Sequence, residues 1–277
     1  INAMEITGNT GLLAVLGNPI KHSLSPKIHN YLSDRLGRNY VYVAFEIPDV
    51  TKAIESVRTL GISGVNVTSP FKEKAAQCVD FTDDEARAVG SVNTIVNKDG
   101  KLYGYSTDGE GLYRALMYEN INVERKNVLV IGAGGAARAT LAMLGRRDAA
   151  RIVIKNRTEV KAKQLCESFN KFYNCEKYFL YSEPEKFDIV INTTSVGMGS
   201  CDCPVDDEKI FDWAEAAVDL IYYPRQTEFL KIADEKGIKT VNGLGMLAFQ
   251  GVLAYELFTG EEVPHKLWRK VLELIDE

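Results

Sequence analysis

Residues 127–158 read NVLVIGAGGAARATLAMLGRRDAARIVIKNRT, and this stretch decides the fold. Its short apolar run, 128–131, is typical of a parallel strand that is buried on both faces. Gly132, Gly134 and Ala137 then fit the spacing G-x-G-x-x-G/A. In that pattern the first glycine makes a tight turn, the second lets the backbone approach a pyrophosphate, and the small third residue permits close helix packing. The stretch therefore predicts a dinucleotide site.

A helix and a second strand follow the glycine loop. Residues 136–144 are alanine-rich and predict a close-packed helix whose free N–H groups face the phosphate. Residues 151–155, RIVIK, predict the next strand, after which NAD-binding chains usually carry an acid for the ribose hydroxyls. This chain has Asn156-Arg157-Thr158 there. A cation suits a 2'-phosphate, so we expect NADP in preference to NAD; the alternative is an ordinary turn beside a surface arginine.

Composition limits the classes of protein that remain. A chain of 277 residues, 45% of them hydrophobic, can bury a real core in one large or two modest domains. The net charge of -5 argues against a general nucleic-acid or anionic-membrane surface, although a local basic pocket stays possible. Five cysteines without a paired framework favour a reducing, cytoplasmic location. No apolar run reaches the roughly 18 residues of a membrane span.

The sequence also predicts no metal site. Cys201-x-Cys203 lacks a second ligand pair at a suitable spacing, so a loop with two free thiols is the simpler interpretation. The three histidines, His22, His29 and His265, are too scattered to form one.

The first hundred residues predict a separate α/β unit. Ser25-Pro26 is a good helix start, with serine at the N-cap and proline at the first helical position. Lys98-Asp99-Gly100 between two apolar runs indicates a hairpin. In this part we expect strands at 12–16, 40–47, 62–67, 92–97 and 102–106, and helices after Ser25 and at 50–60.

The rest of the chain predicts the remainder of a doubly wound nucleotide domain and two closing helices. Polar residues just past strand ends are where open α/β sheets bind ligands, and 193–197 and 222–224 are such places. We expect further strands at 188–192, 217–221 and 239–241, and helices at 112–118, 227–236, 246–258 and around 267–275.

Three polar clusters lie at strand ends or helix starts in the first unit: Ser23 with Ser25; Asn66, Thr68 and Lys72; and Asn93 with Asp108. Their donors and acceptors suit a small polyhydroxylated acid. Each also has a simpler explanation. Ser25 and Asp108 could cap helices, Asn66 and Thr68 could satisfy turn backbone, and Lys72 could be a solvated surface lysine. The residues alone leave a cofactor domain beside an unidentified pocket.

Nine motifs occur in an order that resembles the shikimate dehydrogenase family: HSLSP at 22–26, GVNVTSPFKE at 64–73, SVNT at 91–94, STDGEG at 106–111, GAGGAARA at 132–139, NRT at 156–158, NTTSVGM at 192–198, DLIYYP at 219–224 and NGLGMLAFQ at 242–250. The resemblance implies an α/β chain of two domains. Residues 1–108, completed by 243–277, would form the substrate-binding and catalytic domain, and 109–242 the NADP-binding Rossmann domain. The active site would lie in the cleft between them.

The same resemblance implies residue roles. Lys72 and Asp108 would be the catalytic pair. The substrate shikimate would be bound by Ser23, Ser25, Asn66, Thr68, Asn93, Asp108, Tyr222 and Gln250. The cofactor NADP would be bound by Gly132, Ala133, Gly134, Gly135, Ala136, Asn156, Arg157, Thr158, Lys161, Thr194, Ser195, Leu220 and Gly243. The implied activity is reversible reduction of 3-dehydroshikimate in chorismate and aromatic amino-acid biosynthesis, by a monomer or homodimer.

Three positions depart from the family pattern. Ser106 stands where asparagine is usual, Lys161 where arginine is common, and Leu220 where methionine is common. Lysine keeps the charge but loses the bidentate fork of arginine. Two other functions stay open: a quinate or broad quinate/shikimate dehydrogenase, and a silent ligand sensor, which the presence of both Lys72 and Asp108 disfavours.

Overall fold

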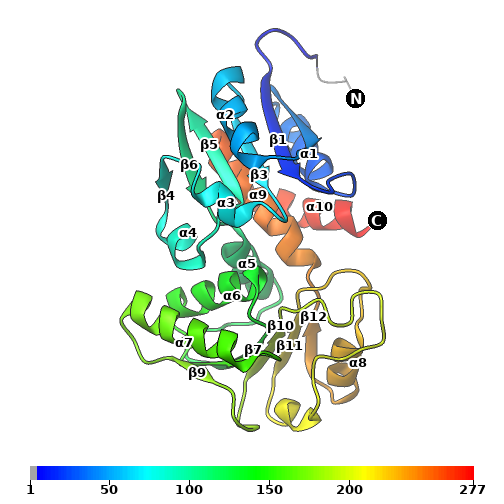
Figure 1. The fold of residues 1–277 in the computed structure, drawn as a ribbon. Coiled ribbons are helices and arrows are strands. Elements are labelled where there is room, and N and C mark those ends of the chain that lie inside the picture. Colours follow the sequence, from blue (N-terminus) through cyan, green and yellow to red (C-terminus); the bar gives the residue numbers. More distant parts are fainter. Residues whose placement is uncertain (1–4) are drawn as a thin grey trace. The chain divides into compact units, whose positions relative to one another are not determined.

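The computed structural model describes residues 5–277, which divide into two compact units (Figure 1). Unit 1 comprises the described residues up to Thr107 together with Ala248–Glu277, and unit 2 comprises Asp108–Leu247. Each unit has its own six-stranded sheet covered by helices, so the chain is an α/β protein. Across residues 5–277, no helix is both long enough and apolar enough to cross a membrane.

Unit 1 has a mixed sheet in the order β2-β1-β3-β5-β6-β4. β1, β2 and β3 are parallel, whereas β5 runs antiparallel to both β3 and β6. The strands are β1 (Gly11–Gly17), β2 (Tyr40–Glu46), β3 (Gly64–Val67), β4 (Phe81–Thr82), β5 (Thr94–Lys98) and β6 (Lys101–Tyr105). The helices are α1 (Ser25–Leu36), α2 (Val50–Leu60), α3 (Lys72–Ala76), α4 (Asp84–Val89), α10 (His265–Asp276) and most of α9 (Leu244–Thr259).

Local chemistry explains where α2 begins and ends, and why α9 packs closely on β3. The Asp49 carboxylate accepts hydrogen bonds from the backbone N–H groups of Thr51 and Lys52, which caps α2, and Gly61 ends it in the left-handed region. A Cβ on Gly64 would lie 2.3 Å from the ring of Phe258. Only glycine therefore allows α9 to pack this closely on β3.

Unit 2 has an entirely parallel sheet in the order β12-β11-β10-β7-β8-β9. Its strands are β7 (Asn127–Ile131), β8 (Arg151–Lys155), β9 (Tyr178–Leu180), β10 (Ile189–Asn192), β11 (Ala216–Asp219) and β12 (Lys239–Val241). Its helices are α5 (Asp108–Tyr118), α6 (Gly135–Arg146), α7 (Glu159–Tyr173) and α8 (Glu228–Glu235), with the 3-10 turn η1 (Glu208–Phe211). Figure 1 shows α6 and α7 on one face and α8 on the other, as right-handed crossovers require. The strand order reverses between β7 and β10, which is the switch point where such sheets bind ligands.

The structure corrects one local prediction and adds elements that we did not predict. The N-cap of α1 is Leu24, without a side-chain cap, so the prediction that the Ser25 side chain caps this helix was wrong. α5 begins at Asp108, four residues before the predicted start. α7 and strands β4 and β9 were not predicted as elements.

Candidate active site

The glycine loop after β7 leaves room for a ligand in front of α6. Gly132 has φ of 117°, and a Cβ there would lie 2.4 Å from Thr193 Oγ1, so the turn requires glycine. A Cβ on Gly134 or on Gly135 would meet no protein atom within 4 Å. The first turn of a helix has N–H groups without intrahelical partners. Exposed glycines at such a turn let a pyrophosphate reach those groups.

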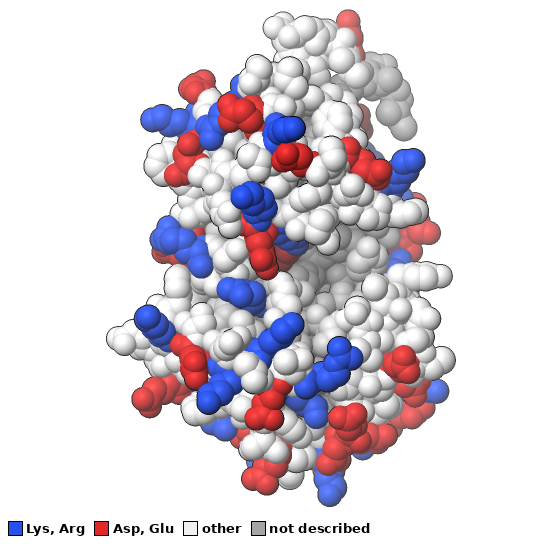
Figure 2. Space-filling model, in the orientation of Figure 1, with Lys and Arg blue, Asp and Glu red and all other residues white. Residues whose placement is uncertain are grey.

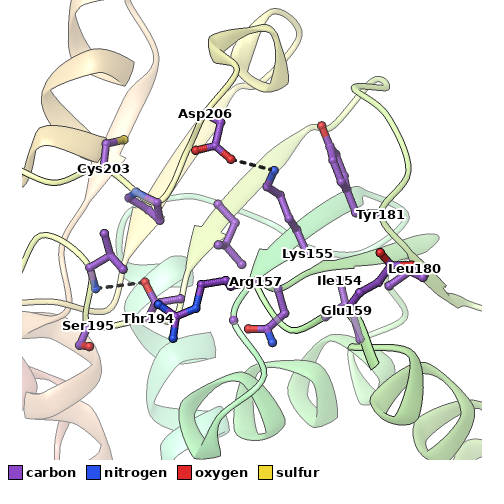
Figure 3. A pocket seen from close by; sticks show the side chains of 15 residues that line it. Ile154, Lys155, Arg157, Glu159, Leu180, Tyr181, Thr194, Ser195, Cys203 and Asp206 are labelled. Carbon is purple, nitrogen blue, oxygen red and sulfur yellow. Dashed lines mark hydrogen bonds and ion pairs between the residues drawn. The ribbon is translucent and has the colours of Figure 1, made fainter. Parts of the chain in front are cut away.

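A cavity of about 700 Å³ opens at the switch point of unit 2 (Figure 3). It is lined by Ile131, Gly132, Ile154, Lys155, Asn156, Arg157, Glu159, Leu180, Tyr181, Thr194, Ser195, Val196, Cys203, Pro204 and Asp206. Five predicted cofactor residues are therefore brought together, namely Gly132, Asn156, Arg157, Thr194 and Ser195. The other predicted cofactor positions are Ala133, Gly134, Gly135 and Ala136 on the glycine loop, Thr158 and Lys161 at α7, and Leu220 and Gly243 after β11 and β12.

The cationic wall of the cavity is formed by Arg157 and Lys155. Arg157 is exposed, and within residues 5–277 its guanidinium makes no hydrogen bond or ion pair. The Lys155 ammonium lies 3.7 Å from the Asp206 carboxylate and 4.7 Å from the centre of the Tyr181 ring. Figure 3 shows Lys155 reaching toward Asp206 and Arg157 extending toward Thr194. A guanidinium without an internal partner suits a phosphate, because its fork of donors matches phosphate oxygens.

Figure 2 shows basic side chains gathered on the visible face of unit 2, with acidic side chains between them. This local gathering contrasts with the net charge of -5 of the chain.

A buried carboxylate fixes the loop after β10. Asp219 is fully buried; it accepts hydrogen bonds from Asn192 Nδ2 at 3.1 Å and from Thr227 Oγ1 at 2.7 Å. Burial raises the pKa of this carboxyl group above its usual range. Asn192 Oδ1 in turn accepts from the Thr194 hydroxyl at 2.7 Å and from its backbone N–H at 3.0 Å. Asp219 and Asn192 together thereby set the position of Thr194 in the cavity wall.

Gly243 keeps the backbone after β12 close to Leu220. A Cβ on Gly243 would lie 1.9 Å from the Leu220 carbonyl oxygen, and the Gly243 N–H donates to the Ile221 carbonyl at 3.0 Å. Any side chain at position 243 would therefore displace the segment that leads to Tyr222.

The polar residues of unit 1 converge on one edge of its sheet. β1 and β3 are parallel, so the segments after their carboxyl ends, with Ser23 and Thr68, leave at the same edge. β5 is antiparallel to β3, and β6 to β5. Asn93, just before β5, and Thr107, just after β6, therefore arrive at that edge too. Four separated segments of chain are assembled there by strand direction alone.

Hydrogen bonds tie this edge together. Asn66 Nδ2 donates to the Asn93 carbonyl at 3.1 Å and to Thr94 Oγ1 at 3.0 Å. Asn93 Oδ1 accepts from the Thr107 N–H at 2.9 Å. The Ser25 N–H donates to Ser23 Oγ at 3.2 Å. Asn66 on β3 thus bonds both the backbone of the bend at Asn93 and the side chain of Thr94 on β5.

The remaining predicted site residues lie as follows. Lys72 is the first residue of α3; it is half-buried, and its carbonyl accepts from the Val92 N–H at 3.0 Å. Gln250 is half-buried in α9, beside Gly251, where a Cβ would touch Ile28 of α1. Asp108 is the first residue of α5, directly after Thr107, and it belongs to unit 2. Tyr222 is an exposed residue of unit 2, after β11.

Sequence reasoning missed several residues at these sites. In unit 2, Tyr181, Cys203 and Asp206 line the cavity from loops whose course no periodicity predicts. In unit 1, Tyr42 donates a hydrogen bond to Asn66, although its apolar strand suggests only a core position. Among residues 5–277 no group of three or more His, Cys, Asp or Glu side chains is placed to hold a metal ion.

The strand order of unit 2, its glycine turn and its cationic cavity define a dinucleotide-binding protein of the Rossmann class, with a cluster of polar side chains on a second α/β unit. Three family models match: the shikimate dehydrogenase substrate-binding domain at residues 15–95, shikimate/quinate 5-dehydrogenase at 115–198, and the shikimate 5'-dehydrogenase C-terminal domain at 243–273. The chain belongs to the shikimate dehydrogenase family.

Individual relatives agree. The chain is 42% identical over 266 residues to the shikimate dehydrogenase (NADP(+)) of Caldanaerobacter subterraneus. The aligned region covers 93% of this chain and 95% of that one. The shikimate 5-dehydrogenase of Listeria monocytogenes, solved with shikimate and NAD, superposes with a TM-score of 0.90 at 34% identity, covering 98% and 99%. That of Thermus thermophilus, solved with NADP(H) and shikimate, gives a TM-score of 0.85 at 34% identity, covering 95% and 99%.

Proposed function

We propose that this chain is an NADP-dependent shikimate dehydrogenase that reversibly reduces 3-dehydroshikimate to shikimate. The observation that carries the proposal is the match of the substrate-binding family model to residues 15–95. That segment supplies Ser23, Asn66, Thr68 and Lys72 to one edge of the unit 1 sheet. Relatives that are named shikimate dehydrogenase (NADP(+)) over nearly their whole length support the same activity.

The residues of unit 2 fit NADP. The open space in front of Gly134 and Gly135 accepts the pyrophosphate at the start of α6. The exposed guanidinium of Arg157 donates hydrogen bonds to the 2'-phosphate, with Asn156, Thr158 and Lys161 around it. Thr194 and Ser195 line the same cavity beyond β10. When bound, the reduced nicotinamide supplies a hydride from C4 to C3 of the substrate.

The proposed substrate residues bind the acid and move one proton. Ser23 and Ser25 donate hydroxyl hydrogens to the carboxylate, and Asn66, Thr68, Asn93, Tyr222 and Gln250 bind around the ring. During reduction Lys72, an ammonium donor, gives a proton to the carbonyl oxygen as C3 gains the hydride, so ketone, hydride and proton balance to the alcohol. Asp108 is the partner of Lys72, and in oxidation the pair takes the proton back.

Steady-state turnover tests this proposal. Shikimate and quinate are compared with NADP and NAD, using wild type, Lys72→Ala and Lys74→Ala. Lys74 is an exposed residue of the same helix whose ammonium bonds only Gln77 among the contacts within residues 5–277, so it is a matched control. We expect Lys72→Ala to lower kcat by roughly a hundred- to ten-thousandfold with less effect on the KM of shikimate. Equal turnover of quinate would move the assignment to a broad quinate/shikimate dehydrogenase, and a wild type without turnover would indicate a ligand sensor.

We also place the enzyme in the cytoplasm, as a monomer or homodimer that binds neither nucleic acid nor a membrane surface. The five cysteines are all free, as suits a reducing compartment. Fractionation of cells and measurement of the molar mass in solution test these two statements.

A further inference from the structure

Lys155, the last residue of β8, has an ammonium group that is held in the wall of the unit 2 cavity. Its side chain is 24% exposed. The ammonium lies 4.7 Å from the centre of the Tyr181 ring and 3.7 Å from the Asp206 carboxylate. These two neighbours come from the loops after β9 and after β10, and both line the cavity (Figure 3). An aromatic face attracts a cation, so Tyr181 helps to keep the lysine at the cavity.

The backbone of Lys155 is fixed beside the glycine turn. Lys155 is paired with Ile131 in the parallel register of β7 and β8, and its carbonyl accepts a hydrogen bond from the Gly132 N–H at 2.8 Å. The side chain therefore starts from the edge of the sheet, next to the turn that we assign to the pyrophosphate and two positions before Arg157. A side chain on a strand is positioned more precisely than one on a loop.

The ion pair between Lys155 and Asp206 is easily exchanged for another. The Asp206 side chain is 90% exposed, so water screens its attraction to the ammonium and little is lost when the two separate. A phosphate monoester carries more negative charge than a carboxylate and offers more acceptor oxygens. A phosphate that enters the cavity therefore replaces Asp206 as the partner of Lys155. An unphosphorylated ribose brings no charge for this exchange and leaves the ion pair intact.

We infer that Lys155 binds the 2'-phosphate of the cofactor together with Arg157, and that Asp206 competes with this phosphate for the lysine. The ion pair thereby sets how strongly the cavity prefers a phosphorylated over an unphosphorylated adenosine. This inference rests on the proposed function, because that function assigns NADP to the cavity.

The test measures binding and not turnover. Adenosine 2',5'-bisphosphate and adenosine 5'-monophosphate differ only in the 2'-phosphate, so the ratio of their Kd values isolates the contact with that group. Calorimetry on the full chain without substrate gives both values. The variants are Lys155→Met, which keeps an unbranched stem against Tyr181 without the charge, and Asp206→Asn, which removes the competing charge. Lys163→Met is the control, because Lys163 is an exposed residue of α7 that does not line the cavity.

We expect Lys155→Met to weaken binding of the bisphosphate about tenfold and to leave the Kd of the monophosphate within about twofold of wild type. Asp206→Asn should strengthen binding of the bisphosphate about threefold, as suits the loss of an exposed competitor. Lys163→Met should keep the wild-type ratio. Lys155→Gln, which also lacks the charge, must give the same ratio as Lys155→Met, so the result does not depend on one variant folding.

A double substitution separates competition for Lys155 from general electrostatics. If Asp206 acts through the lysine, Asp206→Asn has no further effect in the Lys155→Met background. Glu159 is the matched acid, because it lines the same cavity but forms no ion pair within residues 5–277. Any gain in binding from Glu159→Gln should therefore persist when Lys155 is replaced.

The results that would overturn the inference differ from the result that would overturn the proposed function. If Lys155→Met keeps the wild-type ratio, Lys155 does not contact the 2'-phosphate. If Asp206→Asn strengthens binding equally in both backgrounds, Asp206 does not compete for the lysine. Either result leaves the NADP-dependent activity standing. A wild type that binds the two compounds equally would contradict the assignment of NADP to this cavity, and the inference would fail with it.

Discussion

Single side chains decide which ligands these sites can accept. At the end of β8 the sequence predicts a cation for the 2'-phosphate, and the structure places that cation, Arg157, in the cavity wall without an internal partner among residues 5–277. Its place directly after the second strand of the glycine motif was therefore enough to identify it as a residue of this cavity. Tyr42 could not be found in this way, because a tyrosine in an apolar strand is usually a core residue and its partner, Asn66, lies on another strand.

Arg157→Asp should remove most of the preference for NADP. The change replaces donors that match phosphate oxygens by a carboxylate that repels the 2'-phosphate and accepts from ribose hydroxyls. Because the 2'-phosphate is remote from the reacting carbon, we expect the KM of NADP to rise at least tenfold while kcat changes little. Values of kcat/KM for NADP and NAD measure the effect.

Lys163→Asp is the matched control for that experiment. Lys163 is an exposed residue of α7 that does not line the cavity, and the substitution changes the charge by the same amount. An equal loss of discrimination in Lys163→Asp would mean that general electrostatics, not contact with Arg157, selects the cofactor.

His29 should make the stability of the folded chain depend on pH. Its pKa is about 3 when folded and close to 6.5 when exposed in the unfolded chain, so the unfolded state binds more protons between these values. The stabilisation that comes from keeping His29 neutral is fully present above pH 6.5 and is lost progressively as the pH falls toward 3. Between pH 7 and pH 5 this one group should lower the free energy of unfolding by about 2 kcal/mol.

Urea unfolding of wild type and His29→Phe at both pH values measures this contribution. Phenylalanine keeps a flat ring against Tyr42 but cannot be protonated. Wild type should lose about 2 kcal/mol more than the variant between the two pH values. Identical losses would show that the imidazole becomes protonated without unfolding.

At the scale of elements, the parallel strands were the most predictable part. Their continuous apolar runs leave little choice of structure, and β8, β12 and α2 have the predicted limits. α7 was not predicted, although Ala162, Leu165, Cys166 and Phe169 form a buried face with helical spacing that could have indicated it. The loop residues Tyr181 and Asp206 were beyond prediction, because loops have no period that says where they pass.

The turn between β7 and α6 allows stability and binding to be separated. At Gly134 the backbone is extended, with φ of -90°, and an added Cβ would meet no protein atom within 4 Å. Gly134→Ala should therefore change the free energy of unfolding by less than about 1 kcal/mol. It should still weaken NADP binding about tenfold, because the methyl group occupies the space of the pyrophosphate.

Gly132→Ala is the contrasting variant, because there φ is 117° and the added Cβ would lie 2.4 Å from Thr193 Oγ1. The free energy of unfolding of Gly132→Ala should fall by roughly 1 to 3 kcal/mol, and its NADP binding should weaken as well. Chemical denaturation and titration with NADP distinguish the two variants. Unchanged NADP affinity in Gly134→Ala would show that the pyrophosphate does not bind at this loop.

At the scale of the whole molecule, long-range packing is what sequence reasoning could not supply. Gly64 is recognisable as a glycine in a strand, but nothing near it in the sequence identifies Phe258 as the neighbour that excludes a Cβ. The resemblance of nine ordered motifs did supply the family, because short motifs keep their order even where the packing that joins them cannot be deduced.

The proposed division of binding, with NADP on unit 2 and shikimate on unit 1, predicts two footprints in hydrogen exchange. NADP should slow exchange at the start of α6, at residues 155–158 and at 193–196, because these segments border the cavity of unit 2. Shikimate should slow exchange at residues 23–25, 66–72 and 93–94 of unit 1, where the polar edge is assembled. At a concentration of 100 times its Kd, either ligand adds about 2.7 kcal/mol to stability, enough to slow exchange about a hundredfold where the amide opens only by unfolding. Each ligand is added alone and then together with the other. Protection by NADP confined to unit 1, or by shikimate confined to the glycine loop, would contradict the division of binding between the units.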